Sequence, residues 1–389
     1  MRSYTKYSRA NSTGVCTNIR DTIFSYIYVD DTAEKIIEDE HMQRLRYVKQ
    51  LAFAYLVYPG ANHTRFEHSL GTYHVTKTIM QNIGAMEINE VAYVGLLHDI
   101  GHAAFSHISD FALERYLKKT HEEIGEEIIS SSCIKDILSD AGLSFKKFVK
   151  YFKGAGPGAL VTGALGSDRI DYLIRDSYYT GVAYGAIDYN RLINKIALSL
   201  GVPALYKQAI TSAESLLIAR YLMFSSVYYH HTVAIAGGMY GKALSNAIEH
   251  GAVEPKLLSS YNDWELVSIL SSEKSSKEIM QRILSRRLFK RVYDGEIPDG
   301  LSVSDLEGAL GKAGFAEDDY IIDNPSFKIK DYDLPVIADE GKHIGMLSES
   351  SPLIRTLASA MNNTNRLLIA CDVRNVSKAK RVISKELRT

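Results

Sequence analysis

The stretch VAYVGLLHDIGHAAFSH, residues 91–107, places a His–Asp pair directly after an apolar helical run. Burial of such a pair costs free energy unless each group is hydrogen-bonded or bound to a metal. Neighbouring helical residues point about 100° apart, so His98 and Asp99 can approach one ion only where the helix ends. Gly101 supplies such a break. We therefore expect a metal or phosphate site at the end of a buried helix.

The histidines gather around this stretch. Seven of the twelve lie between residues 63 and 121, where even spacing would place fewer than two: His63, His68, His74, His98, His102, His107 and His121. Two further elements that contain acidic residues lie on either side of the His98–Asp99 pair: RFEHS (65–69), which contains His68, and SDRIDYLIRD (167–176). Histidine nitrogens mixed with carboxylate oxygens suit Fe, Mn, Ni, Zn or Mg. The pattern therefore predicts a divalent metal without distinguishing among these ions.

Apolar residues recur at three- and four-residue steps through most of the chain, which is the spacing of amphipathic helices. We expect helices over 32–51, 67–83, 88–99, 106–119, 121–131, 144–152, 165–178, 188–198 and 212–249. Before them, aromatic and β-branched residues up to position 31 predict a strand or hairpin. The Gly-rich segment 153–167 lacks the GK[ST] ending of a P-loop, so it is interpreted as a mobile connection.

The sequence changes in character after Pro298. Short β-like runs at 320–323, 334–337 and 366–372 alternate with helical stretches at 303–313, 351–361 and 375–387. We therefore expect a mainly α fold in three parts: a multi-helix catalytic core at 1–255, a helical connector at 256–298 and a small α+β C-terminal domain at 299–389.

Composition narrows the class of protein. The chain has 389 residues, 46% hydrophobic and 23% charged, with a formal net charge of -1. These values favour a soluble globular protein, and the near-zero charge disfavours one that coats duplex DNA. The longest uncharged run, between Arg220 and Lys242, contains too many polar residues for a membrane span. No apolar stretch follows the basic residues at the N-terminus, so we do not expect a secretory signal there. Three isolated cysteines argue against disulfides, so we expect a cytoplasmic protein.

Several motifs together resemble those of the HD-domain phosphohydrolase superfamily, and in particular its deoxynucleoside triphosphate (dNTP) triphosphohydrolase branch. The motifs are QRLRYVKQL (43–51), YPGANHTRFEHSLG (58–71), LLHDIGHAAFSH (96–107), THEEIG (120–125) and SDRIDYLIRD (167–176). The resemblance covers residues 20 to about 235, in the order and at the spacing of that family. It implies an HD-domain core with one catalytic divalent metal. It also implies hydrolysis of a dNTP at the α-phosphate, which releases the deoxynucleoside and intact triphosphate.

The resemblance also assigns roles to the clustered histidines and acids. His121, with Glu122 beside it, matches the position proposed in the family for proton transfer at the α-phosphate. A metal lowers the pKa of bound water, and an imidazole can protonate a departing oxygen. His102 and His107 would face the same cavity. The implied metal ligands are His68, His98, Asp99 and Asp168.

Substrate contacts follow from the same resemblance. Arg65 and Arg169 would bind the triphosphate, a role that the bidentate guanidinium suits. Tyr172 would pack on the sugar and exclude a 2′-hydroxyl. Gln50 would contact the deoxyribose. Arg220 and Tyr228 would supply further contacts to the phosphates and the sugar. Some animal members carry a histidine where this chain has Phe224, so the contacts of that helix differ here.

A possible effector site lies in QRLRYVKQL. By itself this alternation of basic and apolar residues is typical of a solvated helix face. In the family the segment often lies at an oligomer interface and binds an activating nucleotide, which implies a homo-oligomer, either a dimer or a tetramer. The residues retained for that role are Gln43, Arg44, Arg46 and Lys49.

Other residues have plainer interpretations. His63 and His74 are expected to be structural, and Asp171 to pair with Arg175 one helical turn later. Two other functions stay open: an HD phosphoesterase acting on a mono- or diphosphate, a signalling nucleotide or single-stranded nucleic acid, and a nucleotide-sensing oligomer without catalysis. Arg65, Arg169 and Tyr172 favour the triphosphate branch, because a monophosphate needs fewer cations.

Overall fold

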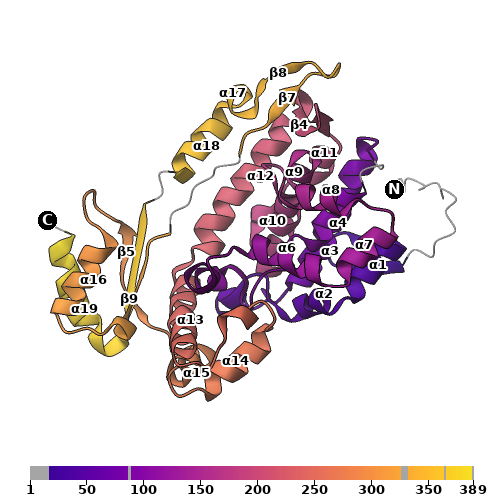
Figure 1. Ribbon diagram of the computed structural model, residues 1–389. Coiled ribbons are helices and arrows are strands. Elements are labelled where there is room, and N and C mark those ends of the chain that lie inside the picture. Colours follow the sequence, from indigo (N-terminus) through magenta and orange to yellow (C-terminus); the bar gives the residue numbers. More distant parts are fainter. Residues whose placement is uncertain (1–16, 86–88, 326–331, 363–364, 388–389) are drawn as a thin grey trace.

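The computed structural model describes residues 17–85, 89–325, 332–362 and 365–387. A helical body makes up most of the molecule, and a smaller lobe lies at one end (Figure 1). The helices of the body in chain order are α1 (Asp31–Glu38), α2 (Glu40–Arg44), α3 (Arg65–Asn82), α4 (Glu90–Leu97), α5 (Asp110–Ala112), α6 (His121–Ser131), α7 (Ile134–Asp140), α8 (Phe145–Phe152), α9 (Ala159–Thr162), α10 (Ser167–Thr180), α11 (Tyr189–Ile193), α12 (Ile210–Met223), α13 (His231–Glu249), α14 (Asp263–Ser272), α15 (Lys277–Leu284), α17 (Leu347–Ser350) and α18 (Pro352–Asn362). The fold is mainly α, as predicted.

Three helices position the candidate site. α3 begins at Arg65 because Thr64 caps it: Thr64 Oγ1 accepts the Glu67 N–H, and the Glu67 carboxylate accepts the Thr64 N–H at 2.8 Å. Every residue of α4 is buried, as expected for a helix that is apolar on all sides. α3 packs against both α4 and α10. The end of α4 thereby meets the first turns of α3 and α10.

The strands form three small sheets. They are β1 (Thr17–Asp21), β2 (Ser25–Val29), β3 (Ile196–Ser199), β4 (Val202–Tyr206), β5 (Lys290–Glu296), β6 (Tyr320–Asp323), β7 (Pro335–Ile337), β8 (His343–Met346) and β9 (Arg366–Cys371). β1 and β2 make the predicted antiparallel hairpin. The second sheet has the order β3-β4-β7-β8, with β4 and β7 parallel, and the third has the order β5-β9-β6.

Four predicted helices differ from the structure. The one expected over 32–51 is divided at Asp39 and its last helical turn ends at Tyr47, and the one expected over 106–119 is a succession of short 3₁₀, α and π turns. The helix expected over 188–198 ends at Ile193, and β3 pairs with β4 through a two-residue turn. Leu200 and Gly201 have φ values of 52° and 80° there, which a tight hairpin of this kind requires. The helix expected over 212–249 is divided: α12 leads into a π-helical turn at Phe224–Tyr228, and α13 starts afresh at His231.

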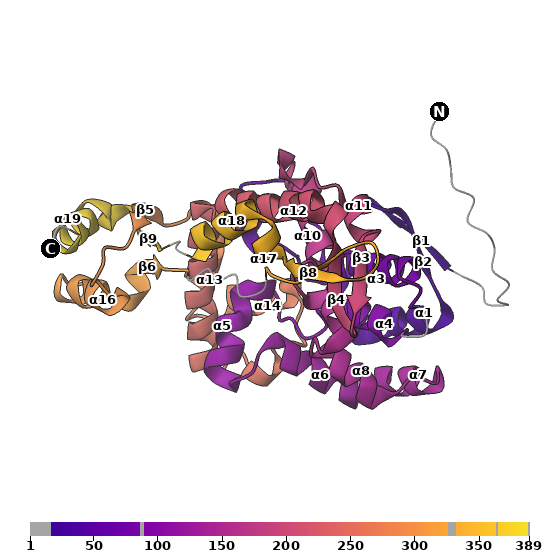
Figure 2. The ribbon, with the colours of Figure 1, turned by 90° about the horizontal axis from the view of Figure 1, so that it is seen from above.

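The C-terminal lobe contains β5, β9 and β6 with α16 (Val303–Lys312) and α19 (Val376–Glu386) beside them (Figure 2). It has its own apolar core, which includes Leu306, Leu367 and Ile383. The predicted strands and helices after residue 298 are present within a residue or two of their expected positions. The domain boundaries stay a prediction. β5 comes from the expected connector and pairs with β9 of the expected C-terminal domain. β7 and α18 come from that same expected domain, but β7 pairs with β4 and α18 packs against α12, both in the body.

The Gly-rich segment 153–167 is folded, which corrects its interpretation as a mobile connection. It forms a 3₁₀ turn at Gly156–Gly158 and α9, and Leu160 and Val161 are buried. Packing of these apolar side chains outweighs the conformational freedom of the glycines. Among the described residues no helix combines the length and apolarity needed to cross a bilayer.

Candidate metal and catalytic site

The four predicted metal ligands lie together. His68 Nε2 is 3.1 Å from Asp168 Oδ1 and 3.2 Å from His98 Nε2, and His98 Nε2 is 3.6 Å from Asp168 Oδ1. Asp99 approaches both imidazoles, with Oδ2 3.5 Å from His68 Nε2 and Oδ1 3.3 Å from His98 Nε2. We call these four residues the metal cluster. His68, His98 and Asp168 have the spacing of ligands around one ion, and Asp99 lies directly beside them.

The outer nitrogen of each ligand histidine is already engaged. His98 Nδ1 lies 3.0 Å from the Gly95 carbonyl oxygen, which can only accept, so Nδ1 carries the proton. His68 Nδ1 lies 2.8 Å from Asp171 Oδ2 in the same way. Both rings therefore turn Nε2 toward the other ligands, which is how histidines are oriented at metal sites. The residues present fit a divalent cation.

Asp171 connects this orientation to a buried ion-pair chain. Arg175 donates to Asp171 through Nε and Nη2, both at 2.9 Å, and through Nη1 to Asp21 at 2.9 Å. The expected Asp171–Arg175 pair is thus present, and the sequence interpretation missed the bond to His68. Gly71 makes room for it, because a Cβ there would lie 1.8 Å from Asp171 Oδ1.

Arg65 joins the metal cluster from the first turn of α3. It donates through Nη1 to Asp99 Oδ2 at 2.5 Å and through Nε to Ser106 Oγ at 2.7 Å. Burial by itself would raise the pKa of Asp99, but Arg65 and the imidazoles of His98 and His102 outweigh it and hold that pKa well below its ordinary value. Asp99 is therefore ionised and able to ligate. Arg65 Nη2 is buried and has no hydrogen-bond partner among the described residues.

A second group, the histidine cluster, consists of His102, His107, Asp110 and His121, whose ligand-type atoms lie within 4.8 Å of one another. His107 Nδ1 is 2.9 Å and His121 Nδ1 is 3.4 Å from Asp110 Oδ2. The rings of His102 and His121 stack with centroids 3.7 Å apart. The predicted residues His102, His107 and His121 do meet in one place. Asp110 was missed, although its spacing three residues after His107 was a signal.

The histidine cluster sets its members to different protonation states. Burial lowers the pKa of His121, but the hydrogen bond and the charge of Asp110 raise that pKa by more than burial lowers it. The pKa of His121 therefore lies above its ordinary value. Burial, Arg65 and His121 all lower the pKa of His102, to well below its ordinary value. His121 can thus carry a proton near neutral pH beside a neutral His102. Such a pair can deliver a proton to a departing oxygen.

Three of the predicted substrate residues, Arg169, Arg220 and Tyr228, lie around Tyr172. The charges of Arg220 and Arg169 both act on its hydroxyl. Its ring meets that of Tyr228 edge-on at 6.3 Å and that of His68 at 6.4 Å. Tyr228 donates to Asp176 at 2.6 Å. These residues of α10, α12 and the turn after α12 therefore lie beside the metal cluster.

A groove of about 1000 Å³ opens next to these residues. It runs along α13 toward the C-terminal lobe, and His107 and Tyr228 are among its lining residues. Gln50 does not line this groove: its N–H donates to the His63 carbonyl, and its Oε1 is buried without a hydrogen-bond partner in the described part of the chain. Glu122 is exposed, with Oε1 3.3 Å from His121 Nε2.

The proposed effector residues divide into two groups. Arg46 is exposed, donates to Gln43 Oε1 at 2.8 Å and stacks over Phe66, while Lys49 Nζ binds Asn62. Arg44 instead points inward. Its guanidinium donates to the carbonyl oxygens of Ile100 and His102 at 3.1 and 2.7 Å and to that of Tyr261 at 2.9 Å. Arg44 therefore holds the turn that follows the His–Asp pair, and its part in an effector site stays a prediction.

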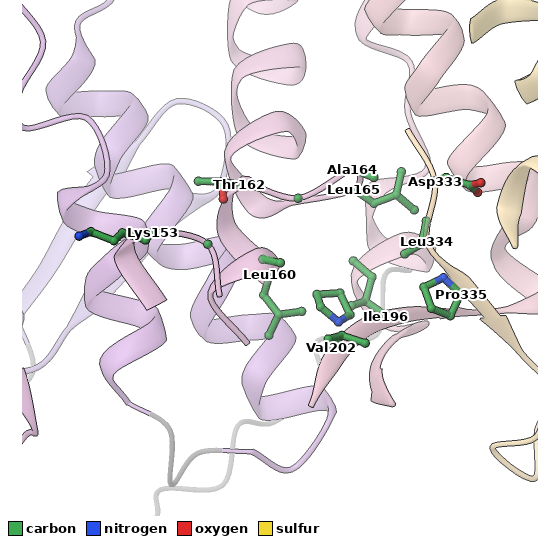
Figure 3. A pocket seen from close by; sticks show the side chains of 14 residues that line it. Lys153, Leu160, Thr162, Ala164, Leu165, Ile196, Val202, Asp333, Leu334 and Pro335 are labelled. Carbon is green, nitrogen blue, oxygen red and sulfur yellow. The ribbon is translucent and has the colours of Figure 1, made fainter. Parts of the chain in front are cut away.

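The remaining features are separate from the site. His63 Nε2 is 2.8 Å from Asp176 Oδ1 and His74 packs against Phe24, in line with structural roles. A pocket of about 410 Å³ lies between the Gly-rich segment and the second sheet (Figure 3). Leu160, Ile196 and Pro335 line it together with the polar residues Lys153, Thr162 and Asp333. None of the predicted site residues lines it, so we assign it no part in the chemistry.

Comparison with known proteins agrees with this geometry. The HD domain family model matches residues 65–176, and the HD associated region model matches residues 187–388. An uncharacterized protein of Methanocaldococcus jannaschii is 37% identical over 363 residues, which are 87% of this chain and 75% of that protein. The human deoxynucleoside triphosphate triphosphohydrolase SAMHD1 is 25% identical over 90% of this chain and 68% of its own length.

A solved structure shares the whole architecture. The crystal structure of a hypothetical protein from Aquifex aeolicus superposes with a TM-score of 0.81 at 30% identity, and the match covers 95% of this chain and all of the other. The matched family models take in the metal cluster, the histidine cluster and the C-terminal lobe. The chain therefore belongs to the HD-domain phosphohydrolase superfamily.

Proposed function

We propose that the chain is a metal-dependent dNTP triphosphohydrolase, which converts a dNTP to its deoxynucleoside and intact triphosphate. The position of His102 carries this proposal. Its Nε2 is 3.3 Å from Asp99 Oδ1, and its Nδ1 is 3.9 Å from Asp110 Oδ1. The metal cluster, which is suited to bind a cation, thus adjoins the histidine cluster, which is suited to deliver a proton. A metal ion and a general acid side by side can together promote hydrolysis of a phosphate ester.

Three observations support a dNTP as substrate. The human relative carries that activity in its name. Arg65 Nη2 is a buried donor and Gln50 Oε1 a buried acceptor, and neither has a partner among the described residues, so a bound nucleotide could satisfy both. The groove beside His107 has room for a nucleoside. Tyr228 lines it and meets Tyr172 edge-on, an aromatic pair that suits a sugar.

Each residue then has a role in the reaction. A divalent ion held by His68, His98, Asp99 and Asp168 would activate water and neutralise phosphoryl charge. Arg65 and Arg169 bind phosphate oxygens and fix the polyphosphate. His121, kept protonated by Asp110, gives its proton to the departing 5′ oxygen, with His107 and Glu122 at the rim of the same cluster. His102, which is neutral, lies between Asp99 and His121, with Nε2 3.3 Å from Asp99 Oδ1 and its ring stacked on that of His121.

We also propose a cytoplasmic homo-oligomer that binds an activating nucleotide at Gln43, Arg46 and Lys49. The exposed guanidinium of Arg46, stacked on an aromatic ring, is suited to phosphate. Light scattering with and without GTP or dGTP tests this part: a mass that stays that of one chain under all conditions would contradict it.

The reaction is tested by a chromatographic screen of all dNTPs and NTPs with Mn²⁺, Mg²⁺ or Fe²⁺, each with and without added GTP or dGTP. The expected products are deoxynucleoside and triphosphate, and the His98→Ala, Asp99→Ala double variant should form neither. Release of inorganic phosphate alone would identify another phosphoesterase. Nucleotide binding without turnover would identify a sensor.

A further inference from the structure

Asp263 lies far from the metal cluster in sequence, in the expected connector, and is almost completely buried at the first position of α14. Its two carboxylate oxygens each accept a backbone N–H from a different segment. Oδ1 accepts that of Phe105 at 2.7 Å, and Oδ2 accepts that of Lys49 at 3.0 Å. Burial raises the pKa of Asp263 to about 6, so the group is ionised at neutral pH and both oxygens accept.

The segment held by Asp263 has a strained backbone. Phe105 and Ser106 have φ values of 61° and 57°, in the left-handed region that bulky side chains rarely adopt. Phe105 is also fixed by ring packing against Phe53 and Tyr240, with centroids 4.7 Å away in each case. Such a conformation persists only where the surroundings determine it.

This strained turn in turn orients Arg65. Ser106 Oγ donates to the Lys49 carbonyl at 2.7 Å and accepts from Arg65 Nε at 2.7 Å. Arg65 then donates to Asp99 Oδ2. A continuous set of hydrogen bonds therefore runs from the start of α14, through residues 105 and 106, to a carboxylate of the metal cluster.

We propose that Asp263 is a positioning residue for the metal cluster: by bonding the Phe105 and Lys49 amides it fixes Ser106, and through Ser106 it orients Arg65 on Asp99. The inference rests on the proposed metal site and deepens it, because it adds a requirement from the C-terminal half of the chain. An asparagine cannot replace Asp263, since its amide nitrogen would meet one of the two N–H groups as a second donor.

Asp263→Asn and Glu265→Gln are the matched pair for a test. Glu265 lies in the same first turn and accepts the Asn262 N–H at 2.8 Å, so both variants remove one acidic charge from the start of α14. Hydrogen exchange measured by mass spectrometry should show faster exchange at residues 103–107 and at Lys49 in Asp263→Asn alone. The emission of Trp264, the one tryptophan of the chain, reports whether α14 keeps its place.

Mn²⁺ affinity provides the functional readout without a substrate. Asp263→Asn should weaken Mn²⁺ binding about tenfold, the lower range for residues that orient metal ligands. Ser106→Ala, which removes the link but leaves Asp263 in place, should weaken it similarly, and the double variant should be no worse than either single one because both act on one path.

The outcomes separate the two proposals. Unchanged exchange at residues 103–107 in Asp263→Asn, additive effects of the two substitutions, or equal losses in Glu265→Gln would overturn the role of Asp263. A wild-type protein that binds no Mn²⁺, Mg²⁺ or Fe²⁺ would overturn the metal site itself, and the exchange data would still decide whether Asp263 holds the turn.

Discussion

Replacing Asp171 by asparagine removes a carboxylate that contacts His68 on one side and Arg175 on the other. Asp171 accepts from His68 Nδ1 at 2.8 Å and from two nitrogens of Arg175 at 2.9 Å, and both Asp171 and Arg175 are fully buried. Asparagine keeps the shape but offers only one acceptor oxygen. It can serve His68 or Arg175, and the other partner then faces an amide N–H₂.

The structure sets the size of two effects. Loss of the partner that orients a ligand histidine reduces metal affinity about 10–100-fold, which is about 1.4–2.8 kcal/mol of binding free energy. Breaking a buried ion pair costs about 3–5 kcal/mol, and because Arg175 keeps Asp21 at 2.9 Å we expect the lower end for the free energy of unfolding. Asp171→Asn should therefore fold, melt at a lower temperature and bind Mn²⁺ more weakly.

The matched control is Asp176→Asn. Asp176 lies on the same helix, is also buried, and contacts a histidine, His63, at the same 2.8 Å, but that histidine is not in the metal cluster. Calorimetric titration with Mn²⁺ should show weaker binding in Asp171→Asn only. Equal losses in the two variants, or unchanged affinity in Asp171→Asn, would refute the assignment of His68 as a ligand oriented by Asp171.

Three further predictions follow from individual contacts. Gly71→Ala places a methyl group where Asp171 Oδ1 lies 1.8 Å away, so it should weaken Mn²⁺ binding in the same titration without removing any charge. Asp110→Asn removes the group that raises the pKa of His121, so the alkaline limb of the kcat–pH profile should move to lower pH; an unmoved limb would mean that His121 is not the acid. His107→Ala should retain one metal ion per chain by elemental analysis, because His68, His98 and Asp168 form a group suited to an ion that does not include His107; a fall in metal content would place the ion in the histidine cluster instead.

Helix boundaries near the site were predictable because the signals for them are local. α6 begins at His121, as expected for the helix over 121–131, where Thr120 and Glu123 form a capping box within four residues. β3 was not predictable in this way. Ile196–Ser199 is apolar enough for either structure, and its pairing depends on a sheet completed by β7, which lies more than 130 residues later in the chain.

The candidate site follows the same division. The clustering of histidines and the motif order identify the groups that meet, since both can be read directly from the sequence. Which nitrogen of each ring faces the cluster depends on partners from other elements, such as Asp171 for His68. The spacing of Asp110 from His107 was a local signal, but its contact with His121, 11 residues further on, depends on the turn η3 (Ser106–Ser109) that precedes it.

The motif QRLRYVKQL shows why residue type alone did not separate structural from binding roles. Arg44 and Arg46 are two residues apart, so on a helical turn they point to different sides. Arg44 holds the Ile100 and His102 carbonyls, whereas Arg46 lies on the surface over Phe66. The same segment ends at Lys49, whose backbone contacts Asp263 and Ser106. A nucleotide bound at Arg46 would therefore act on a segment already joined to the Arg65–Asp99 pair, and no long path would be needed for it to affect the metal cluster.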